Sequence, residues 1–139
     1  MKSRNLSSGW RARLLLLGLA VSVPACSASN LTGTTTPTTD TFTGTLLPSG
    51  SITYDVTVKG NGELDLSITS LTPQTTITVG LAIGVSASGG CSPLTNAENA
   101  KVGSILPAEV TPGQYCVAVY DVGNVLNPGD TFTISVLHP

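Results

Sequence analysis

The sequence predicts an all-β protein, an antiparallel β-sandwich of the jelly-roll or Greek-key type with about seven strands. From Thr41 onward, apolar residues recur at every second position, which is the period of a strand with one buried face. Turn-forming residues interrupt this alternation at short intervals, and no segment after residue 40 shows the apolar period of a helix. We therefore expect one β-sandwich domain over residues 41–139, which is long enough to enclose a hydrophobic core.

The first half of this domain contains three predicted strands. Residues 41–46 and 51–59 alternate between apolar and small or polar residues. Gly60-Asn61-Gly62 then supplies the backbone freedom that a tight turn demands, so we expect a hairpin with the next strand at residues 63–70. The positions expected to face the core are Phe42, Leu46, Ile52, Tyr54, Val56, Val58, Leu64, Leu66 and Ile68.

The second half continues the alternation less regularly. Residues 75–85 form the next predicted strand, and small residues on its second face indicate a close approach or a bend at Gly80, Ala82 and Gly84. Residues 86–99 are rich in turn formers and predict a loop, followed by a short strand or turn within residues 101–110. Residues 115–121 and 131–137 alternate again. Their expected core positions, with those of residues 75–85, are Ile77, Val79, Leu81, Ile83, Val85, Tyr115, Val117, Val119, Phe132, Ile134 and Val136.

Residues 1–25 resemble the signal peptide of a bacterial lipoprotein. They combine a basic start, an apolar run at residues 14–23 and small residues at the exit. The run is too short to span a bilayer, since a spanning helix needs roughly 20 apolar residues. Val23-Pro24-Ala25-Cys26 is similar to the lipobox, which predicts lipidation of Cys26; the alternative is an ordinary signal cut nearby, for instance after Ala28. Ser27 after the anchor resembles the pattern of lipoproteins sorted to the outer membrane.

Residues 26–40 predict a flexible, Thr-rich linker between the lipid and the domain. Small, polar and turn-forming residues dominate it, and they cannot bury enough apolar surface to offset the entropy of ordering. Removal of residues 1–25 leaves Lys59 and Lys101 against 8 Asp and Glu, a formal net charge of -6 (2 - 8). Because proteins that bind nucleic acid present basic patches to phosphate, we expect no nucleic-acid partner.

The cysteine count fits an exported protein. The chain has three cysteines, and an odd number leaves one thiol to explain, which lipidation of Cys26 does. Cys91 and Cys116 are then expected to form a disulfide, because disulfides persist in the compartments that exported proteins reach. The alternative, a zinc pair, is incomplete, since two thiolates and one distant imidazole, His138, do not make a zinc site.

The sequence predicts neither a catalytic residue nor a cofactor site, so we do not expect an enzyme. A Ser-His-Asp arrangement needs an imidazole between nucleophile and carboxylate, and His138 is expected to be an exposed tail residue beyond the last strand. Acylation of Cys26 and pairing of the other two cysteines leave no free thiolate. The Gly-rich run at residues 85–90 lacks the Lys and the following helix of a phosphate-binding loop.

Carboxylates are considered separately, because a glycosidase can carry out catalysis with two carboxyl side chains alone. Asp55, Glu63 and Asp65 alternate with apolar residues on the two strands of the predicted hairpin and would share its outward face. A solvated sheet face that deters aggregation is the simpler interpretation, and we favour it.

Two further groups remain as candidates. Asp121, Asn124 and Asp130, in or beside the loop before the last strand, carry oxygen atoms of the kind that bind calcium. They are weak candidates, because Asx residues also build turns, and we assign no metal site. Tyr120 is expected to face outward beside Cys116, either toward a ligand or packed around the disulfide.

The end of the domain carries a more specific motif. Residues 110–119 read VTPGQYCVAV, in which Pro112 and Gly113 predict a turn between sheets. Tyr115 begins the next strand, where its hydroxyl can bond back to the corner backbone, as in a tyrosine corner. With the closing strand at residues 130–136, this motif resembles the end of bacterial pre-peptidase C-terminal domains. The resemblance implies a jelly-roll-like sandwich of the kind appended to secreted proteases and other extracellular proteins.

These observations together indicate a non-catalytic lipoprotein of the bacterial cell envelope. We expect a lipid on Cys26 to hold it in the membrane, and the β-sandwich to bind a protein or glycan at the cell surface. The alternative is a carbohydrate- or calcium-binding accessory domain for a secreted hydrolase.

Overall fold

The computed structural model describes residues 35–88 and 90–139. The predicted signal peptide, the predicted lipidation site at Cys26 and most of the predicted linker lie outside these residues. Within the described ranges, no helix is long and apolar enough to cross a membrane.

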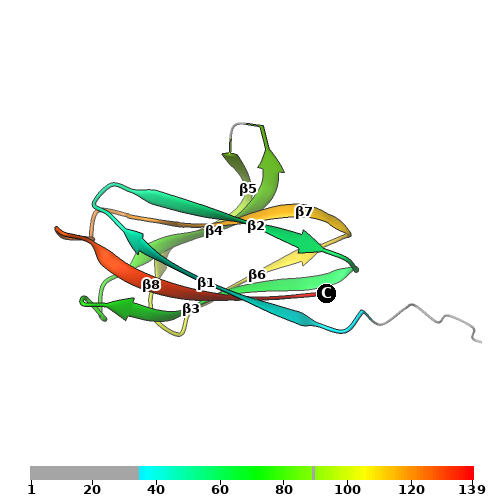
Figure 1. Ribbon diagram of the computed structural model, residues 1–139, viewed down its shortest axis with the longest axis horizontal. Coiled ribbons are helices and arrows are strands. Elements are labelled where there is room, and N and C mark those ends of the chain that lie inside the picture. The colour runs from blue at the N-terminus through cyan, green and yellow to red at the C-terminus, as the bar shows by residue number, and fades with distance from the viewer. Residues whose placement is uncertain (1–34, 89) are drawn as a thin grey trace, which may run out of the picture. The chain divides into compact units, whose positions relative to one another are not determined.

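Eight strands form the described part of the chain, in two four-stranded antiparallel sheets. One sheet has the order β1-β8-β3-β6 and the other the order β2-β7-β4-β5, and the two face each other as a sandwich (Figure 1). The predicted fold class is therefore confirmed, with one strand more than expected. The strands are β1 (Thr38–Leu46), β2 (Ser51–Val58), β3 (Gly62–Thr72), β4 (Val79–Ala87), β5 (Gly90–Ala100), β6 (Ile105–Val110), β7 (Gly113–Tyr120) and β8 (Asp130–His138).

The hydrophobic core lies between the sheets, where the inward side chains of both meet. Burial of one large aliphatic or aromatic side chain stabilises a fold by roughly 1.5–3 kcal/mol, so a core of this kind holds the sandwich together. The inward positions that the alternation predicts are largely correct. Core members from the two sheets include Leu46, Leu64, Leu66, Ile68, Phe132, Ile134, Leu81, Ile83, Val117 and Val119.

The turn at residues 60–62 does not form the predicted hairpin. It carries the chain from β2 in one sheet to β3 in the other, and β2 pairs instead with β7, from Ser51↔Tyr120 to Val58↔Gly113. A turn motif shows where the chain reverses, whereas the choice of partner strand depends on contacts distant in sequence. Asp55 therefore does not share a face with Glu63 and Asp65, and that part of the prediction is wrong.

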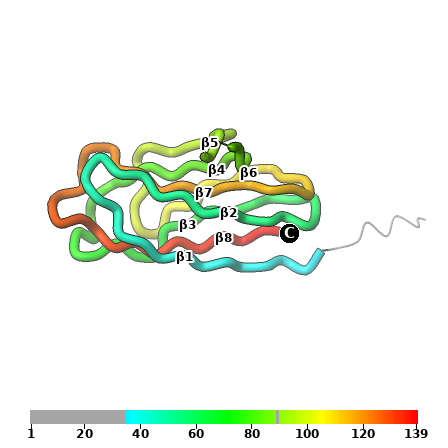
Figure 2. The backbone as a smooth tube through the Cα atoms, turned by 45° about the horizontal axis from the view of Figure 1, so that its top comes forward, coloured from blue at the N-terminus to red at the C-terminus, as the bar shows by residue number. Residues whose placement is uncertain are grey.

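The predicted loop at residues 86–99 is also wrong, because it forms the end of β4 and most of β5. We call residues 85–88 and 90–94 the arm, because this hairpin tip rises away from the sandwich in Figure 1 and comes toward the viewer in Figure 2. Nearly all of its described side chains are exposed, Leu94 at 60%. Within the described part of residues 86–99 only Ala97 packs against the core, so this segment lacks the apolar alternation of the other strands and the sequence pattern did not reveal it.

Two local predictions are confirmed. The backbone N–H of Thr111 donates to the Tyr115 hydroxyl at 3.1 Å, which is the expected tyrosine corner, and residues 111–112 connect β6 in one sheet to β7 in the other. The small residues of β4 mark close approaches. A Cβ at Gly80 would overlap the Tyr120 ring, and one at Gly84 would overlap the backbone of Ser92.

His138 differs from the prediction as well. It is not an exposed tail residue but the last residue of β8, only 5% exposed and paired in register with Thr38. Strand β1 begins three residues earlier than expected, at Thr38, and β8 extends by one residue beside it. His138 continues the inward parity of Ile134 and Val136, so its burial follows from the same alternation.

Candidate functional site

Three adjoining cavities follow the outward residues of β2, two of them on the outer face of the β2-β7-β4-β5 sheet and one at its edge beside β1. The side chains of Ser51, Thr53, Asp55 and Thr57 alternate outward along β2, about 6.6 Å apart. Thr53 and Gly90 line both the first cavity and the second, and Asp55 lines both the second and the third. The outward residues of β2 therefore form a common wall, and the hollowed surface mixes polar and apolar side chains.

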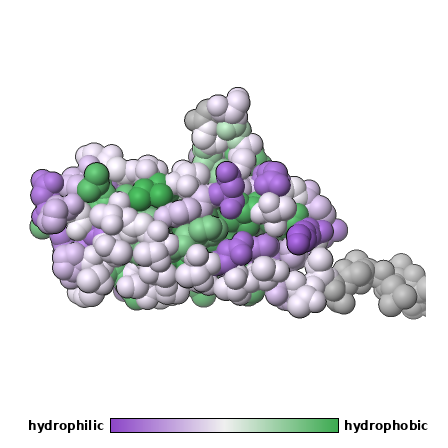
Figure 3. Space-filling view, in the orientation of Figure 1, coloured by the Kyte–Doolittle hydropathy of each residue, from purple (hydrophilic) through white to green (hydrophobic). Residues whose placement is uncertain are grey.

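The first cavity, which we call the arm groove, lies beneath the arm and has a volume of about 480 Å³. Its floor is made by small side chains on β4 and β7, and β2 and β5 form the two sides. In Figure 3 the arm stands above the main body of the sandwich as a pale green and white knob. The residues that line the groove are Ser51, Thr53, Ala82, Gly90, Cys91, Pro93, Asn96, Ala118 and Tyr120.

Tyr120 lies at one end of the arm groove. It faces outward as predicted, and its ring covers Gly80, its neighbour across the β4–β7 pair. The Asn96 side-chain amide donates to the Tyr120 hydroxyl at 3.3 Å. The absence of a side chain at Gly80 therefore sets where the ring sits, while the hydroxyl and the amide form a polar pair at the cavity wall.

The disulfide Cys91–Cys116 joins β5 to β7, with the two Cα atoms 5.6 Å apart. Cys116 is buried and Cys91 is partly exposed in the wall of the arm groove. The predicted pair is thus present, and it ties the start of β5 to the sheet face. The link holds the arm where apolar packing does not, and a disulfide agrees with an exported protein.

The second cavity, of about 410 Å³, continues from the arm groove past Asp55. The Ser86 hydroxyl lies 2.8 Å from Asp55 Oδ1 and 3.0 Å from the Tyr115 carbonyl oxygen, and it can donate its one proton to either acceptor. Asp55 therefore contacts β4 across the intervening strand β7. It shares this cavity with neither Glu63 nor Asp65, which belong to β3 in the other sheet.

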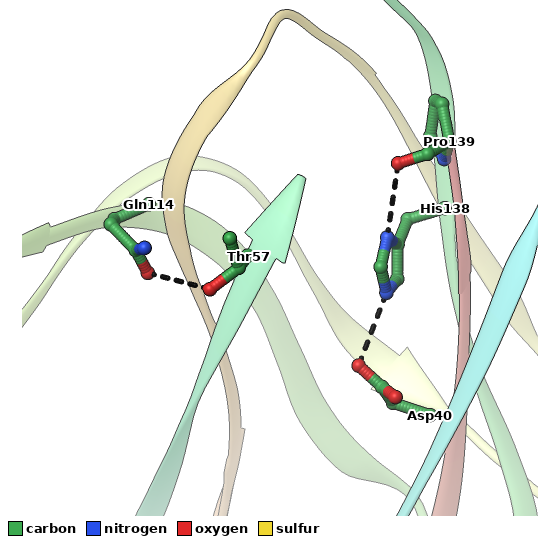
Figure 4. A network of polar contacts seen from close by, with 5 residues as sticks. All are labelled: Asp40, Thr57, Gln114, His138 and Pro139. Atoms are coloured by element: carbon green, nitrogen blue, oxygen red, sulfur yellow. Dashed lines mark hydrogen bonds and ion pairs between the residues drawn. The ribbon is translucent and has the colours of Figure 1, made fainter. Parts of the chain in front are cut away.

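The third cavity, which we call the edge cleft, opens between the edge strands β1 and β2 and has a volume of about 400 Å³. Figure 4 shows the His138 ring pointing toward Asp40, with Nε2 3.1 Å from Asp40 Oδ2 and Nδ1 3.3 Å from the Pro139 carbonyl oxygen. On the neighbouring strands, the Thr57 hydroxyl donates to Gln114 Oε1 at 3.1 Å. Lining residues of the cleft are Thr38, Asp40, Thr41, Phe42, Asp55, Thr57, Lys59 and His138.

The Asp40–His138 pair was missed by the sequence reasoning, because strand pairing brings together residues from opposite ends of the domain. It does not constitute a catalytic dyad of the Ser-His-Asp kind. The two ring nitrogens of His138 face oxygens of Asp40 and Pro139, and within the described residues no hydroxyl or thiol is hydrogen-bonded to either nitrogen, as the nucleophile of such a site would be. Within the described ranges, no group of three or more His, Cys, Asp or Glu side chains is arranged to hold a metal.

Phe42 and Tyr54 meet where the two edge strands face each other. Their rings stack with centroids 4.5 Å apart, and the Tyr54 hydroxyl donates to the Thr43 carbonyl oxygen at 3.1 Å. Burial raises the pKa of Tyr54, which keeps the hydroxyl protonated and able to donate. This contact occupies a backbone oxygen in the middle of β1, while no equivalent contact is made to the backbone of β2 within the described residues.

The calcium candidates are instead used to organise loops. The backbone N–H of Ser49 donates to Asp121 Oδ2 at 2.7 Å, and those of Gly123, Asn124 and Val125 donate to Oδ1. The Ser49 bond is the largest influence and lowers the pKa of Asp121. Burial is the second largest and raises the pKa, and the bonds from Val125, Asn124 and Gly123 lower it further, so that the net direction is downward. The carboxylate is therefore saturated by donors, as in an Asx-built turn.

Asn124 and Asp130 bind other parts of the structure. The Asn124 amide nitrogen donates to the Thr78 hydroxyl at 2.8 Å, and Asp130 Oδ1 accepts from the backbone N–H of Gln74 at 2.9 Å. Asp130 is fully buried, and its Oδ2 accepts no hydrogen bond within the described residues. Asp121 thus contacts the turn before β2, and Asn124 and Asp130 both contact the connection between β3 and β4, which supports the turn-building alternative.

Comparisons with known proteins return likenesses of fold. No protein-family model matches the chain, and no curated protein sequence matches it. Eight chains of solved structure do match. One is the mitogen derived from Yersinia pseudotuberculosis, with 15% identity, a TM-score of 0.54, and coverage of 75% of this chain and 88% of that one. At this identity the match shows a shared β-sandwich fold alone.

Two other solved structures match with TM-scores below 0.5. The pre-peptidase C-terminal domain of the Bacillus anthracis collagenase has 17% identity and a TM-score of 0.47, and the match covers 70% of this chain and 85% of that one. PliG, a periplasmic inhibitor of g-type lysozyme from Aeromonas hydrophila, has 12% identity and a TM-score of 0.49, and the match covers 71% and 82%. A pre-peptidase C-terminal domain is thus among the solved structures that this chain resembles in fold.

Proposed function

We propose that this protein is a non-catalytic lipoprotein of the bacterial cell envelope that binds a ligand on the outer face of its β2-β7-β4-β5 sheet. The observation that carries the proposal is the arm groove, a cavity of about 480 Å³ that is lined by uncharged side chains and has one wall held by the Cys91–Cys116 disulfide. Cavities of roughly 300–1,000 Å³ are typical of ligand sites in proteins. Within the described residues no hydroxyl or thiol is hydrogen-bonded to His138, which favours binding over catalysis.

Export and anchoring support the cell-envelope part of the proposal through the signal-like residues 1–25 and the lipobox-like cysteine. Metabolic labelling with a lipid analogue tests the anchor. We expect label on the wild-type protein and none on the Cys26→Ala variant. Equal labelling of the two, or no label on the wild type, would contradict a lipid at Cys26.

The ligand face is tested by photo-crosslinking in the intact envelope. A crosslinking residue replaces either Thr53, in the wall of the arm groove, or Leu137, which is exposed on β8 of the other sheet and serves as the matched control. We expect a discrete crosslinked product from position 53 that is absent from position 137. Similar products from both positions, or none from either, would exclude this face as the binding surface.

A carbohydrate-binding accessory role is the second candidate function, and one contact favours it. Tyr120 lies with its ring over Gly80 and its hydroxyl beside the Asn96 amide, which places an aromatic ring next to a hydrogen-bonding pair at the cavity wall. We would then expect calorimetric titration with neutral oligosaccharides to give binding that Tyr120→Ala abolishes. Titration with calcium serves as the parallel test, and heat that Asp121→Asn removes would favour the calcium alternative.

A further inference from the structure

We propose that the free edge of β2 binds an extended peptide segment that carries a basic side chain, adding a fifth strand to the β2-β7-β4-β5 sheet. This inference concerns the strand edge and the edge cleft. It does not depend on the lipid anchor or on a ligand in the arm groove.

The four edge strands of the sandwich are β1, β6, β2 and β5, and three of them have a feature that opposes strand addition. Proline lacks the N–H that pairing requires, and it interrupts β5 at Pro93 and β6 at Pro107. On β1, the Tyr54 hydroxyl occupies the Thr43 carbonyl oxygen. Strand β2 has neither proline nor a bulge, and its register with β7 is unbroken over its whole length.

The backbone parity of β2 shows which groups face the open edge. Asp121 N–H donates to the Gly50 carbonyl oxygen at 2.9 Å, which continues the β2–β7 ladder by one residue pair. Since the groups of alternate residues point to opposite sides of a strand, the even-numbered residues of β2 face β7. The N–H and C=O groups of Ser51, Thr53, Asp55 and Thr57 therefore face away from β7, and in the described ranges β2 has no second partner strand.

The side chains around this edge favour a basic partner. A side chain on an added strand directly opposite Asp55 would lie about 4.5–5.5 Å from it, Cβ to Cβ. Asp55 is the one charged residue within β2, and Asp40 lines the same edge cleft. Lys59 lies just beyond the end of β2, which confines the preference for a basic residue to the middle of the strand.

The same charges disfavour a second copy of this chain as the occupant. The described residues contain Lys59 and Lys101 against all 8 acidic residues, so two copies repel each other. Antiparallel pairing of β2 with itself about its centre would also bring the two Asp55 side chains near each other. A neutral or basic extended segment is repelled neither by the net charge of the protein nor by Asp55.

The test uses a labelled synthetic octapeptide of alternating Thr and Val with one central Lys, titrated into the full-length protein. Two matched peptides replace the Lys with Glu or with Pro. We expect the Lys peptide to bind at least tenfold more tightly than the other two. Hydrogen exchange should then slow at the amides of residues 51, 53, 55 and 57, with little change at residues 52 and 54, which are already bonded to β7.

Two variants separate the backbone and charge contributions. Thr53→Pro removes an N–H that faces the open edge and leaves the β2–β7 ladder intact, so we expect at least a tenfold loss of peptide affinity. Thr53→Ala keeps that N–H and is the control. Asp55→Asn should retain binding but lose the preference for Lys over Glu. If Thr53→Pro does not fold, the exchange pattern of the wild-type protein decides the question.

Three outcomes would overturn the proposal. The first is equal affinity for the three peptides. The second is a response confined to Tyr120 and Asn96, which would place the peptide in the arm groove. The third is a wild-type dimer that Thr53→Pro makes monomeric in sedimentation, which would show that a second copy occupies the edge.

Discussion

The core strands and the arm belong to the same sandwich but are held by different means. Strand β8 buries Phe132, Ile134 and Val136 completely between the sheets, whereas the arm exposes Leu94 and rests on the Cys91–Cys116 link. Burial is a cooperative property of the whole sandwich, and a covalent bond can position a segment that buries almost nothing. Because the disulfide and not the core holds the arm, the arm can project from the sheet face and form one wall of the arm groove.

The largest expected loss of stability comes from a substitution in the core. Phe132→Ala removes a fully buried ring from β8 and leaves a cavity that a close-packed interior fills poorly. We expect the free energy of unfolding to fall by about 3–5 kcal/mol in denaturant titration. A loss below about 1 kcal/mol would show that the core repacks and that the contrast with the arm is overstated.

Removal of the disulfide is expected to have the next largest effect. Cys91 and Cys116 have a sequence separation of 25, and a crosslink over such a loop stabilises a fold by about 3.5 kcal/mol in the chain-entropy model. The double variant Cys91→Ser with Cys116→Ser should keep the sandwich but speed hydrogen exchange in the arm more than in β3 and β8. Uniform acceleration across all strands would contradict a specific role in holding the arm.

Asp121 tests a third means of stabilisation, the hydrogen bonding of a loop. Its pKa is lowered in the folded state, so its contribution to stability is present above the unfolded pKa, about 3.9. That contribution is lost as the pH falls through the folded pKa. We therefore expect Asp121→Asn to be less stable than wild type at pH 7 and equally stable in strong acid. Thermal unfolding of both proteins at a series of pH values measures this difference. If the stability difference between wild type and Asp121→Asn is the same at every pH, the charge of Asp121 does not contribute to stability.

The smallest effect is expected on the exposed surface of the arm. Leu94→Ser replaces a side chain that is 60% exposed, and such surface changes usually alter stability by less than about 0.5 kcal/mol. The same denaturant titration as for Phe132→Ala provides the comparison. A loss above about 1 kcal/mol would mean that the arm packs against the sandwich in solution.

Local sequence patterns predicted burial and hydrogen bonding correctly where a residue's environment is set by its neighbours in sequence. The alternation of residues 51–58 placed Val56 and Val58 in the core, and the motif around Tyr115 predicted its bond to the corner. Both depend on contacts within a strand or a single turn. The same alternation extends to His138, but treating the last strand as ended at Leu137 hid its burial and its contact with Asp40.

The candidate site was less accessible to sequence reasoning. Its walls come from β2, β7, β4 and β5, which are adjacent only through strand pairing. The residues that shape it are also inconspicuous by type: Thr53 is an ordinary strand residue, and Gly80 is significant only because the Tyr120 ring covers it. The turn at residues 60–62 suggested the wrong partner for β2, so the carboxylates were grouped on a face that does not exist.

By itself the sequence determined the fold class, most inward positions and the prediction that Cys91 and Cys116 pair. These follow from a period of two residues and from the chemistry of exported cysteines, both of which are local or compositional. Only the tertiary structure decided which strand lies beside which, and hence the arm groove, the edge cleft and the open edge of β2. Strand order depends on the free energy of many contacts between distant residues, and no short segment contains that information.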